Sequence, residues 1–215
     1  MDFAHLHVHS YFSLLDGATS PDELVQVACD ASMSAIALTD HNSLAGAVRF
    51  FQAAVDAGVK PIIGVEFETA GIGDWALGIG ERERQRQTAE TQRTQRTTEN
   101  GKRQRPAGHN DTTHIVLLAE DNEGYANLCR LVTAARLGEA RRESAFSDKY
   151  AEVDRDRPLL SQEHLREHCG HLIALSGCQQ RGEIASLLRR KRFREAHEVA
   201  RYYRALFGPD RFFIE

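Results

Sequence analysis

The sequence has little of several features that define whole classes of protein. Its 215 residues include only four cysteines, with no CxxC pair, which argues against a disulfide framework and a zinc ribbon. No apolar run approaches the ~20 residues that a membrane-spanning helix needs, and no basic segment leads into an apolar core as in a secretory signal. The length predicts one α/β domain. The absences predict a cytoplasmic protein without a membrane partner.

Nucleotide-binding and serine-hydrolase motifs are also absent. No GxGxxG or GxxxxGK[ST] follows the first predicted strand, and no GxSxG occurs. The net charge is −4, and residues 80–108 carry eight Lys/Arg against four Asp/Glu, which leaves the remainder at −8. An acidic body does not resemble a self-sufficient nucleic-acid-binding surface. Acidic residues gathered around a cation site would explain the negative charge equally well.

Short apolar segments alternate with helical patterns along the chain. Because most of these segments are apolar enough for burial on both faces, they predict a parallel sheet, as an open doubly wound sheet or a barrel. A helix is expected to begin at Asn42 or Ser43. Residues from about 81 to 113 contain almost nothing apolar and predict a disordered basic Gln/Arg/Thr-rich insertion, more typical of a solvated loop than of a DNA contact. The predicted strands are residues 3–9, 35–39, 61–67, 114–119, 171–176 and 211–215.

Histidines and carboxylates gather at the ends of these predicted strands. His5, His7 and His9 alternate, so in a strand their side chains share one face. Three imidazoles on one face are costly to bury without partners, and neutral imidazole is the commonest metal ligand in proteins. His114 differs because it begins its strand. Further candidates follow strands, where the active-site groups of α/β proteins collect: Asp16, Asp40, His41, Glu66 and Cys178.

Each of these later residues also has an ordinary interpretation when it is taken alone. Asp40 could cap a helix, Glu66 could be a surface carboxylate, and Cys178 could be a small buried apolar residue. Their shared location favours a metal site, and imidazoles with carboxylates and one thiolate suit Zn, Mn or Fe rather than Ca or Mg. Several divalent ions would favour phosphoester hydrolysis, because they neutralise phosphate charge and lower the pKa of bound water.

Six segments, taken in order, resemble the PHP (polymerase and histidinol phosphatase) superfamily, and most closely the PHP domain of bacterial C-family DNA polymerases, both DNA polymerase III alpha and its error-prone relatives. The segments are FAHLHVHSYFSLLDGA, ALTDHNSLAGAVRFFQAA, GVKPIIGVEFE, HIVLLAEDNEGYANLCRLVT, LIALSGCQQRGEI and LFGPDRFFIE. The resemblance implies a single PHP domain over residues 1–215, folded as a distorted (β/α)7 TIM-like barrel that is incomplete at its carboxyl end.

The resemblance also implies a ligand set for up to three divalent ions. Glu66 would be a bridging ligand, Asp40 would orient a ligand, and His5 would be a supporting neighbour. In two respects the sequence departs from the family: Asn42 stands where glycine is common, and no DxH motif, which carries the last ligands, follows RFFIE. Matched position by position, the implied metal ligands are His7, His9, Asp16, His41, Glu66, His114 and Cys178.

Three functions follow as expectations from the resemblance. The first is a metal-dependent phosphoesterase with 3′–5′ exonuclease chemistry, acting on a DNA primer 3′ end beside other polymerase domains and replication or proofreading subunits. The second is a non-catalytic metal-binding module that stabilises the polymerase or docks a partner. The third is a histidinol-phosphate-type phosphatase, against which Cys178 counts because those members usually have histidine there.

Overall fold

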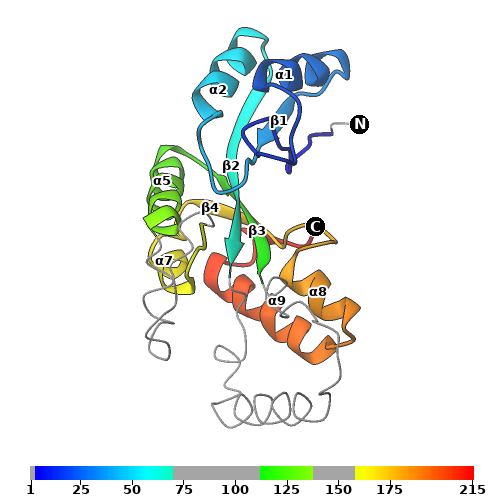
Figure 1. Cartoon of the computed structure of the whole chain (residues 1–215), viewed down its shortest axis with the longest axis vertical. Helices are drawn as coiled ribbons and strands as arrows, with labels where there is room; N and C mark the ends of the chain where they lie inside the picture. The colour runs from blue at the N-terminus through cyan, green and yellow to red at the C-terminus, as the bar shows by residue number, and fades with distance from the viewer. Residues whose placement is uncertain (1–2, 70–111, 138–157) are drawn as a thin grey trace, which may run out of the picture.

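The computed structural model describes residues 3–69, 112–137 and 158–215, and within them it shows one five-stranded sheet flanked by helices (Figure 1). The strands lie in the order of the chain. They are β1 (Ala35–Leu38), β2 (Lys60–Thr69), β3 (Thr113–Ala119), β4 (Leu172–Leu175) and β5 (Phe212–Phe213). The helices are α1 (Pro21–Asp30), α2 (Ala47–Asp56), α5 (Asn122–Leu137), α7 (Gln162–Glu167), α8 (Glu183–Arg189) and α9 (Phe193–Phe207).

The sheet is mixed rather than parallel. β1 pairs with β2 and β4 with β5 in parallel, but β3 runs antiparallel to both of its neighbours. The α/β class is confirmed, whereas the prediction of an all-parallel sheet is wrong. The burial pattern explains the error: five consecutive residues of β3 are buried, and a strand covered on both faces reads the same from sequence whichever way it runs.

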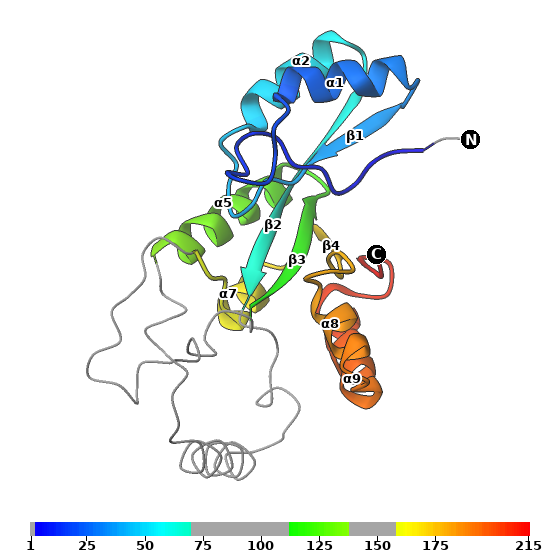
Figure 2. The ribbon, with the colours of Figure 1, turned by 45° about the vertical axis from the view of Figure 1, so that its right-hand side comes forward.

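Besides a small apolar cluster on the sheet around Val116, two main apolar clusters hold the described elements in place. The larger one packs β2, β3 and β4 against α5 and α9, with Phe67, Leu117 and Leu128 fully buried. The smaller one packs α1 and α2 on β1 around Phe50. β2 runs between the two parts of the fold, as Figure 2 shows: α1 and α2 lie near its start, and α7 lies near its end. A residue on β2 is therefore fixed by both parts of the fold.

The amino-terminal segment differs from its prediction. Residues 3–9 do not form a strand; a single bridge joins His5 to Ile36 of β1. The segment nevertheless lies between the two edges of the sheet, because the His7 ring contacts Glu215, two residues beyond β5. Among the described residues no strand pairing joins β1 to β5, so these two strands are the edges of the mixed five-stranded sheet.

Helix starts follow the sequence in one case and not in another. Ser20 caps α1 in a capping box with Glu23, and Pro21 occupies the first turn, as the sequence predicts. Helix α2 begins only at Ala47, several residues later than expected. Asn42 instead has a left-handed backbone, with φ 46°, which asparagine tolerates better than most residues.

Two other expectations concern the ends of segments. The predicted strand 211–215 shortens to Phe212–Phe213. The predicted insertion of about 81–113 lies outside the described residues except for its last two positions. Among the helices that the structure describes, none combines the length and hydropathy required to cross a bilayer.

Candidate metal centre

Imidazoles and carboxylates from four parts of the chain line a cavity of about 620 Å³. The amino-terminal segment, the loop after it, the turn after β1, and the paired strands β2 and β3 supply them. The cavity lies where these elements meet beside the sheet. Its lining includes His7, His9, Asp16, His41, Glu66, His114, Cys178 and Arg181.

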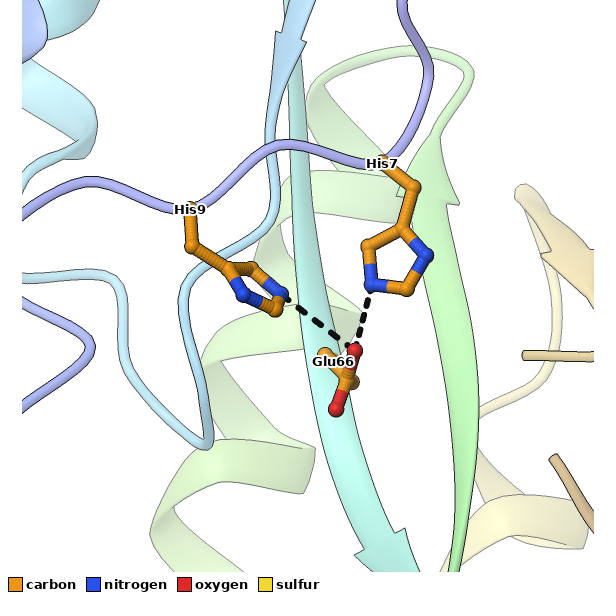
Figure 3. Close-up of side chains that lie close together, drawn as sticks. All are labelled: His7, His9 and Glu66. Carbon is orange, nitrogen blue, oxygen red and sulfur yellow. Dashed lines mark hydrogen bonds and ion pairs between the residues drawn. The ribbon is translucent and has the colours of Figure 1, made fainter. Parts of the chain in front are cut away.

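Glu66, on β2, lies at the centre of this cluster and its side chain is only 2% exposed. Its Oε2 atom contacts Nε2 of His7 and lies 3.3 Å from Nε2 of His9. Figure 3 shows these two rings reaching Glu66 from the amino-terminal segment. Its Oε1 atom lies 3.1 Å from Nδ1 of His41 and contacts Nδ1 of His114. Each carboxylate oxygen therefore faces a different pair of imidazoles.

Asp16 occupies the open side of the cluster, with its side chain 60% exposed. Its Oδ2 atom lies 3.0 Å from Nδ1 of His9 and 2.8 Å from Nε2 of His41. Those two rings thus turn one nitrogen towards Glu66 and the other towards Asp16. Asp16 and Glu66 share the same imidazoles.

Asp40 anchors the loop that carries Asp16. Its buried carboxylate accepts hydrogen bonds from the backbone N–H of Ser10 (2.7 Å), from the Ser10 hydroxyl (2.8 Å) and from the Ser13 hydroxyl (2.7 Å). The Ser13 oxygen in turn accepts from the backbone N–H of His41 at 3.1 Å. Asp40 thus holds the loop around Asp16 rather than a ligand ring. Gly17 completes the turn, since a Cβ there would lie 1.9 Å from the Ser10 carbonyl oxygen.

The charges of the cluster reinforce one another. Burial alone would raise the pKa of Glu66, but the imidazoles around it, His114 foremost, hold that pKa well below its usual range. Burial would lower the pKa of His7, yet the Glu215 and Glu66 carboxylates raise it to about 10. Glu66 likewise raises the pKa of His41, and it raises that of His114 against the effect of burial. The carboxylates therefore favour positive charge in their midst.

The donor atoms fit a divalent cation. Within the described residues, His9 Nε2 and Glu66 Oε1 are buried and make no regular hydrogen bond, although a carboxylate oxygen lies 3.3 Å from the first and an imidazole nitrogen 3.1 Å from the second. Buried polar atoms without partners are rare, and an ion is one standard explanation. In the part of the chain that the structure describes, the groups able to hold an ion share donors: His7, His9 and Glu66; His9, Asp16 and His41; and His41, Glu66 and His114.

The structure brings together six of the seven predicted ligand residues. Cys178 lines the same cavity but belongs to none of these donor groups among the described residues. His5 lies elsewhere: its ring packs edge-on against Phe3, with centroids 4.7 Å apart, and it borders a different cavity. The role of His5 as a supporting neighbour, which the resemblance implies, stays a prediction.

The position of His114 follows from the direction of β3. Because β3 is antiparallel to β2, its first residues lie beside the last residues of β2, and His114 pairs with Glu68. A residue at the start of an antiparallel strand thus reaches the same edge as residues near the end of its neighbour. This explains why the one candidate that begins its strand still joins the cluster.

Sequence reasoning missed Ser10, Ser13, Arg181 and Glu215 near the site. Arg181 Nη1 lies 3.4 Å from His114 Nε2, and its backbone carbonyl accepts a hydrogen bond from the His114 N–H. Serine, arginine and glutamate are common surface residues, and no local spacing distinguishes these four. Only the tertiary contacts identify them.

The fold and the site together define an α/β protein with a polyhistidine–carboxylate centre suited to divalent metal. The model of the family described as "PHP domain" matches residues 5–215, and the chain belongs to this family. It is 41% identical to the error-prone DNA polymerase of Symbiobacterium thermophilum, with 100% of this chain and 16% of that protein covered. It is 36% identical to the DNA polymerase III subunit alpha of Treponema pallidum, with 100% and 15% covered.

The chain spans only about one sixth of the length of these relatives. A solved structure of a proposed metal-dependent phosphoesterase from Bifidobacterium adolescentis matches with a TM-score of 0.46 and 15% identity, covering 84% of this chain and 69% of that chain. That likeness is too weak to add to the assignment. Family membership rests on the sequence.

Proposed function

We propose that residues 1–215 form one PHP domain of a bacterial DNA polymerase of the III alpha or error-prone type, and that this domain is a metal-dependent phosphoesterase with 3′–5′ exonuclease chemistry. The observation that carries the proposal is the convergence of four imidazoles on one buried carboxylate inside a cavity. Polymerases among the similar proteins supply the context. Such a polymerase would act in the cytoplasm, where bacterial DNA is copied.

Glu66 would be the bridging ligand. The two oxygens of its side chain face separate imidazole pairs, which supports this role. Bound Zn, Mn or Fe ions, up to three, would neutralise phosphate charge and lower the pKa of water. Asp40 would keep the loop of Asp16 in place throughout. The proposed ligands are His7, His9, Asp16, His41, Glu66, His114 and Cys178.

The residues that line the cavity support the proposal of a nucleotide substrate. Leu14 and Leu15 line it and are 84% and 109% exposed, and Leu15 has an unfavourable left-handed backbone, with φ 69°. Such strain persists where the surroundings enforce it and is frequent at functional sites. Exposed Arg181 also lines the cavity. Apolar surface and a cation at one opening suit a base and a phosphate of a DNA primer 3′ end.

A second function, a metal-binding module that docks other polymerase domains or a replication or proofreading subunit, has one observation in its favour. Cys178 lies in the cavity but outside the donor groups of the described residues. A centre with one donor unused would bind metal and still lack the arrangement for hydrolysis. The experiment must therefore separate metal binding from turnover.

The test compares the unmodified chain with His9→Ala and with His171→Ala, in Mn²⁺ or Zn²⁺. His171 is a matched control because it is a half-exposed histidine that pairs with Asp121 outside the cluster. Substrates are a 5′-labelled primer–template and histidinol phosphate. We expect shortening of the primer from its 3′ end, lost in His9→Ala and kept in His171→Ala, with circular dichroism reporting the fold.

Three results would contradict the exonuclease. Phosphate release from histidinol phosphate alone would make the domain a small-molecule phosphatase. Metal uptake without turnover of either substrate, both in the chain and in the polymerase proposed to contain it, would make it a structural module. Primer shortening that persists in His9→Ala would place the activity outside this cluster.

A further inference from the structure

The two ring nitrogens of His7 face two different carboxylates. Nε2 contacts Glu66, and Nδ1 lies 2.8 Å from Oε1 of Glu215. Figure 3 shows one His7 nitrogen directed at Glu66 and the other on the far side of the ring. Glu215 therefore lies behind His7, away from the centre of the cluster.

Glu215 does not share the position of the candidate ligands. In the described parts of the chain, no group of donors able to hold an ion includes it. Its side chain is 32% exposed, against 2% for Glu66. Among the described residues its side chain contacts the cluster through the His7 ring, so its effect on a bound ion would pass through that ring.

The backbone around Glu215 is fixed to the sheet. Its N–H donates to the hydroxyl of Ser176 at 3.0 Å, and the Ser176 N–H donates to the Phe213 carbonyl at 3.0 Å. Ser176 is buried and directly follows β4. These hydrogen bonds tie the backbone of Glu215 to β4 and β5.

We propose that Glu215 is a positioning residue of the metal centre: it accepts the Nδ1–H of His7, which directs the unprotonated Nε2 into the cluster. A histidine that binds metal commonly donates its other N–H to a carboxylate, which fixes the tautomer and the orientation of the ring. The His5 and Val8 carbonyls accept hydrogen bonds from the N–H groups of Ala37 and Thr39, which hold the backbone on both sides of His7. The contact with Glu215 then sets the orientation of the His7 ring. The inference rests on the proposed metal site and adds a residue to it.

The experiment measures metal affinity in the chain and three variants. Glu215→Ala removes the acceptor, and Glu215→Gln keeps an oxygen that can accept from Nδ1–H; both leave the backbone hydrogen bond to Ser176 intact. Glu123→Ala is the control, because Glu123 lies 3.0 Å from an imidazole nitrogen of His171 outside the cluster. Calorimetric titration with Zn²⁺ alone gives the affinity. Nitrogen-15 NMR of the zinc-loaded chain shows which His7 nitrogen keeps its proton.

We expect Glu215→Ala to bind Zn²⁺ about 10- to 100-fold more weakly, the usual effect of losing such an outer partner. Glu215→Gln should recover most of this loss, Glu123→Ala should match the parent, and His7 should keep its proton on Nδ1 in the parent and in Glu215→Gln. Equal affinities for Glu215→Ala and the parent would overturn the inference alone. So would His7 holding its proton on Nε2. A parent chain that takes up no zinc would overturn the proposed function, and this inference with it.

Discussion

The two ends of the histidine–carboxylate cluster differ in how the fold holds them. Glu66 and His114 form the buried end: both side chains are 2% exposed, and both lie on the paired strands β2 and β3. Asp16 forms the rim end: its side chain is 60% exposed, and it lies on a loop that is hydrogen-bonded to Asp40. A candidate ligand on a buried strand contributes to the core as well as to the proposed site. A candidate ligand on the loop contributes mainly to the proposed site.

The largest effect is expected at the buried end. Glu66→Gln keeps the shape of the side chain but removes the negative charge among the four imidazoles. The affinity for metal should therefore fall by a factor of roughly 100 or more. The free energy of unfolding of the metal-free chain should also fall by about 3 kcal/mol, the low end for breaking a buried ion pair, because imidazoles can shed their protons. Calorimetric titration and urea unfolding measure the two quantities.

Glu183→Gln is the matched control for this prediction. Glu183 is also buried, and it accepts a hydrogen bond from the Tyr203 hydroxyl at 3.1 Å away from the cluster. Its substitution should lower stability and leave metal affinity unchanged. If Glu66→Gln lowered stability but bound metal as tightly as the parent, Glu66 would stabilise the fold without binding metal.

An intermediate effect is expected at the rim. Asp16→Asn should weaken metal binding about tenfold, while the midpoint of urea unfolding stays close to that of the parent because the side chain is exposed. Asp22→Asn serves as the control, since Asp22 is an exposed acid that pairs with Arg49. A marked loss of stability in Asp16→Asn would remove the contrast between rim and buried end.

A change of pH tests the charges of the cluster in the metal-free chain. The pKa of His7 is raised to about 10 from 6.5, so its protonated form contributes stability that is complete below pH 6.5 and is lost as the pH rises towards 10. The metal-free chain should therefore become less stable from pH 7 to pH 9. Zinc binding requires the imidazoles to lose their protons, so affinity should rise over the same interval. Urea unfolding and calorimetry at several pH values check both slopes.

Much of the cluster was predictable because its histidines and carboxylates stand near the ends of short apolar segments. His7, His9, Asp16, His41 and Glu66 stand in the first third of the chain, close to short apolar runs that fold as β1 and β2. Each of them alone has an ordinary structural interpretation, but their shared location at the ends of short apolar segments favours a metal site. Their gathering at one place therefore followed from residue type and from the positions of the strands.

The rest depended on tertiary contacts that leave no local pattern. The direction of β3 is invisible in a run buried on both faces, so the position of His114 followed from its chemistry alone. The strand predicted for residues 3–9 failed because alternation does not provide a partner strand, and β1 offers only one bridge. The serines bound to Asp40 look like any loop serines until the fold brings them to that carboxylate.

The contact between His7 and Glu215 has a consequence for synthesis. These residues are 208 positions apart, so nearly the whole of this sequence must leave the ribosome before His7 can meet its partner. Contacts of such separation form late, because closing a long loop costs entropy before it yields any stabilisation. The loop that joins His9 to Asp16 closes within seven positions. A nascent chain would therefore hold part of its donor set early and gain the oriented His7 only as one of the last steps of folding.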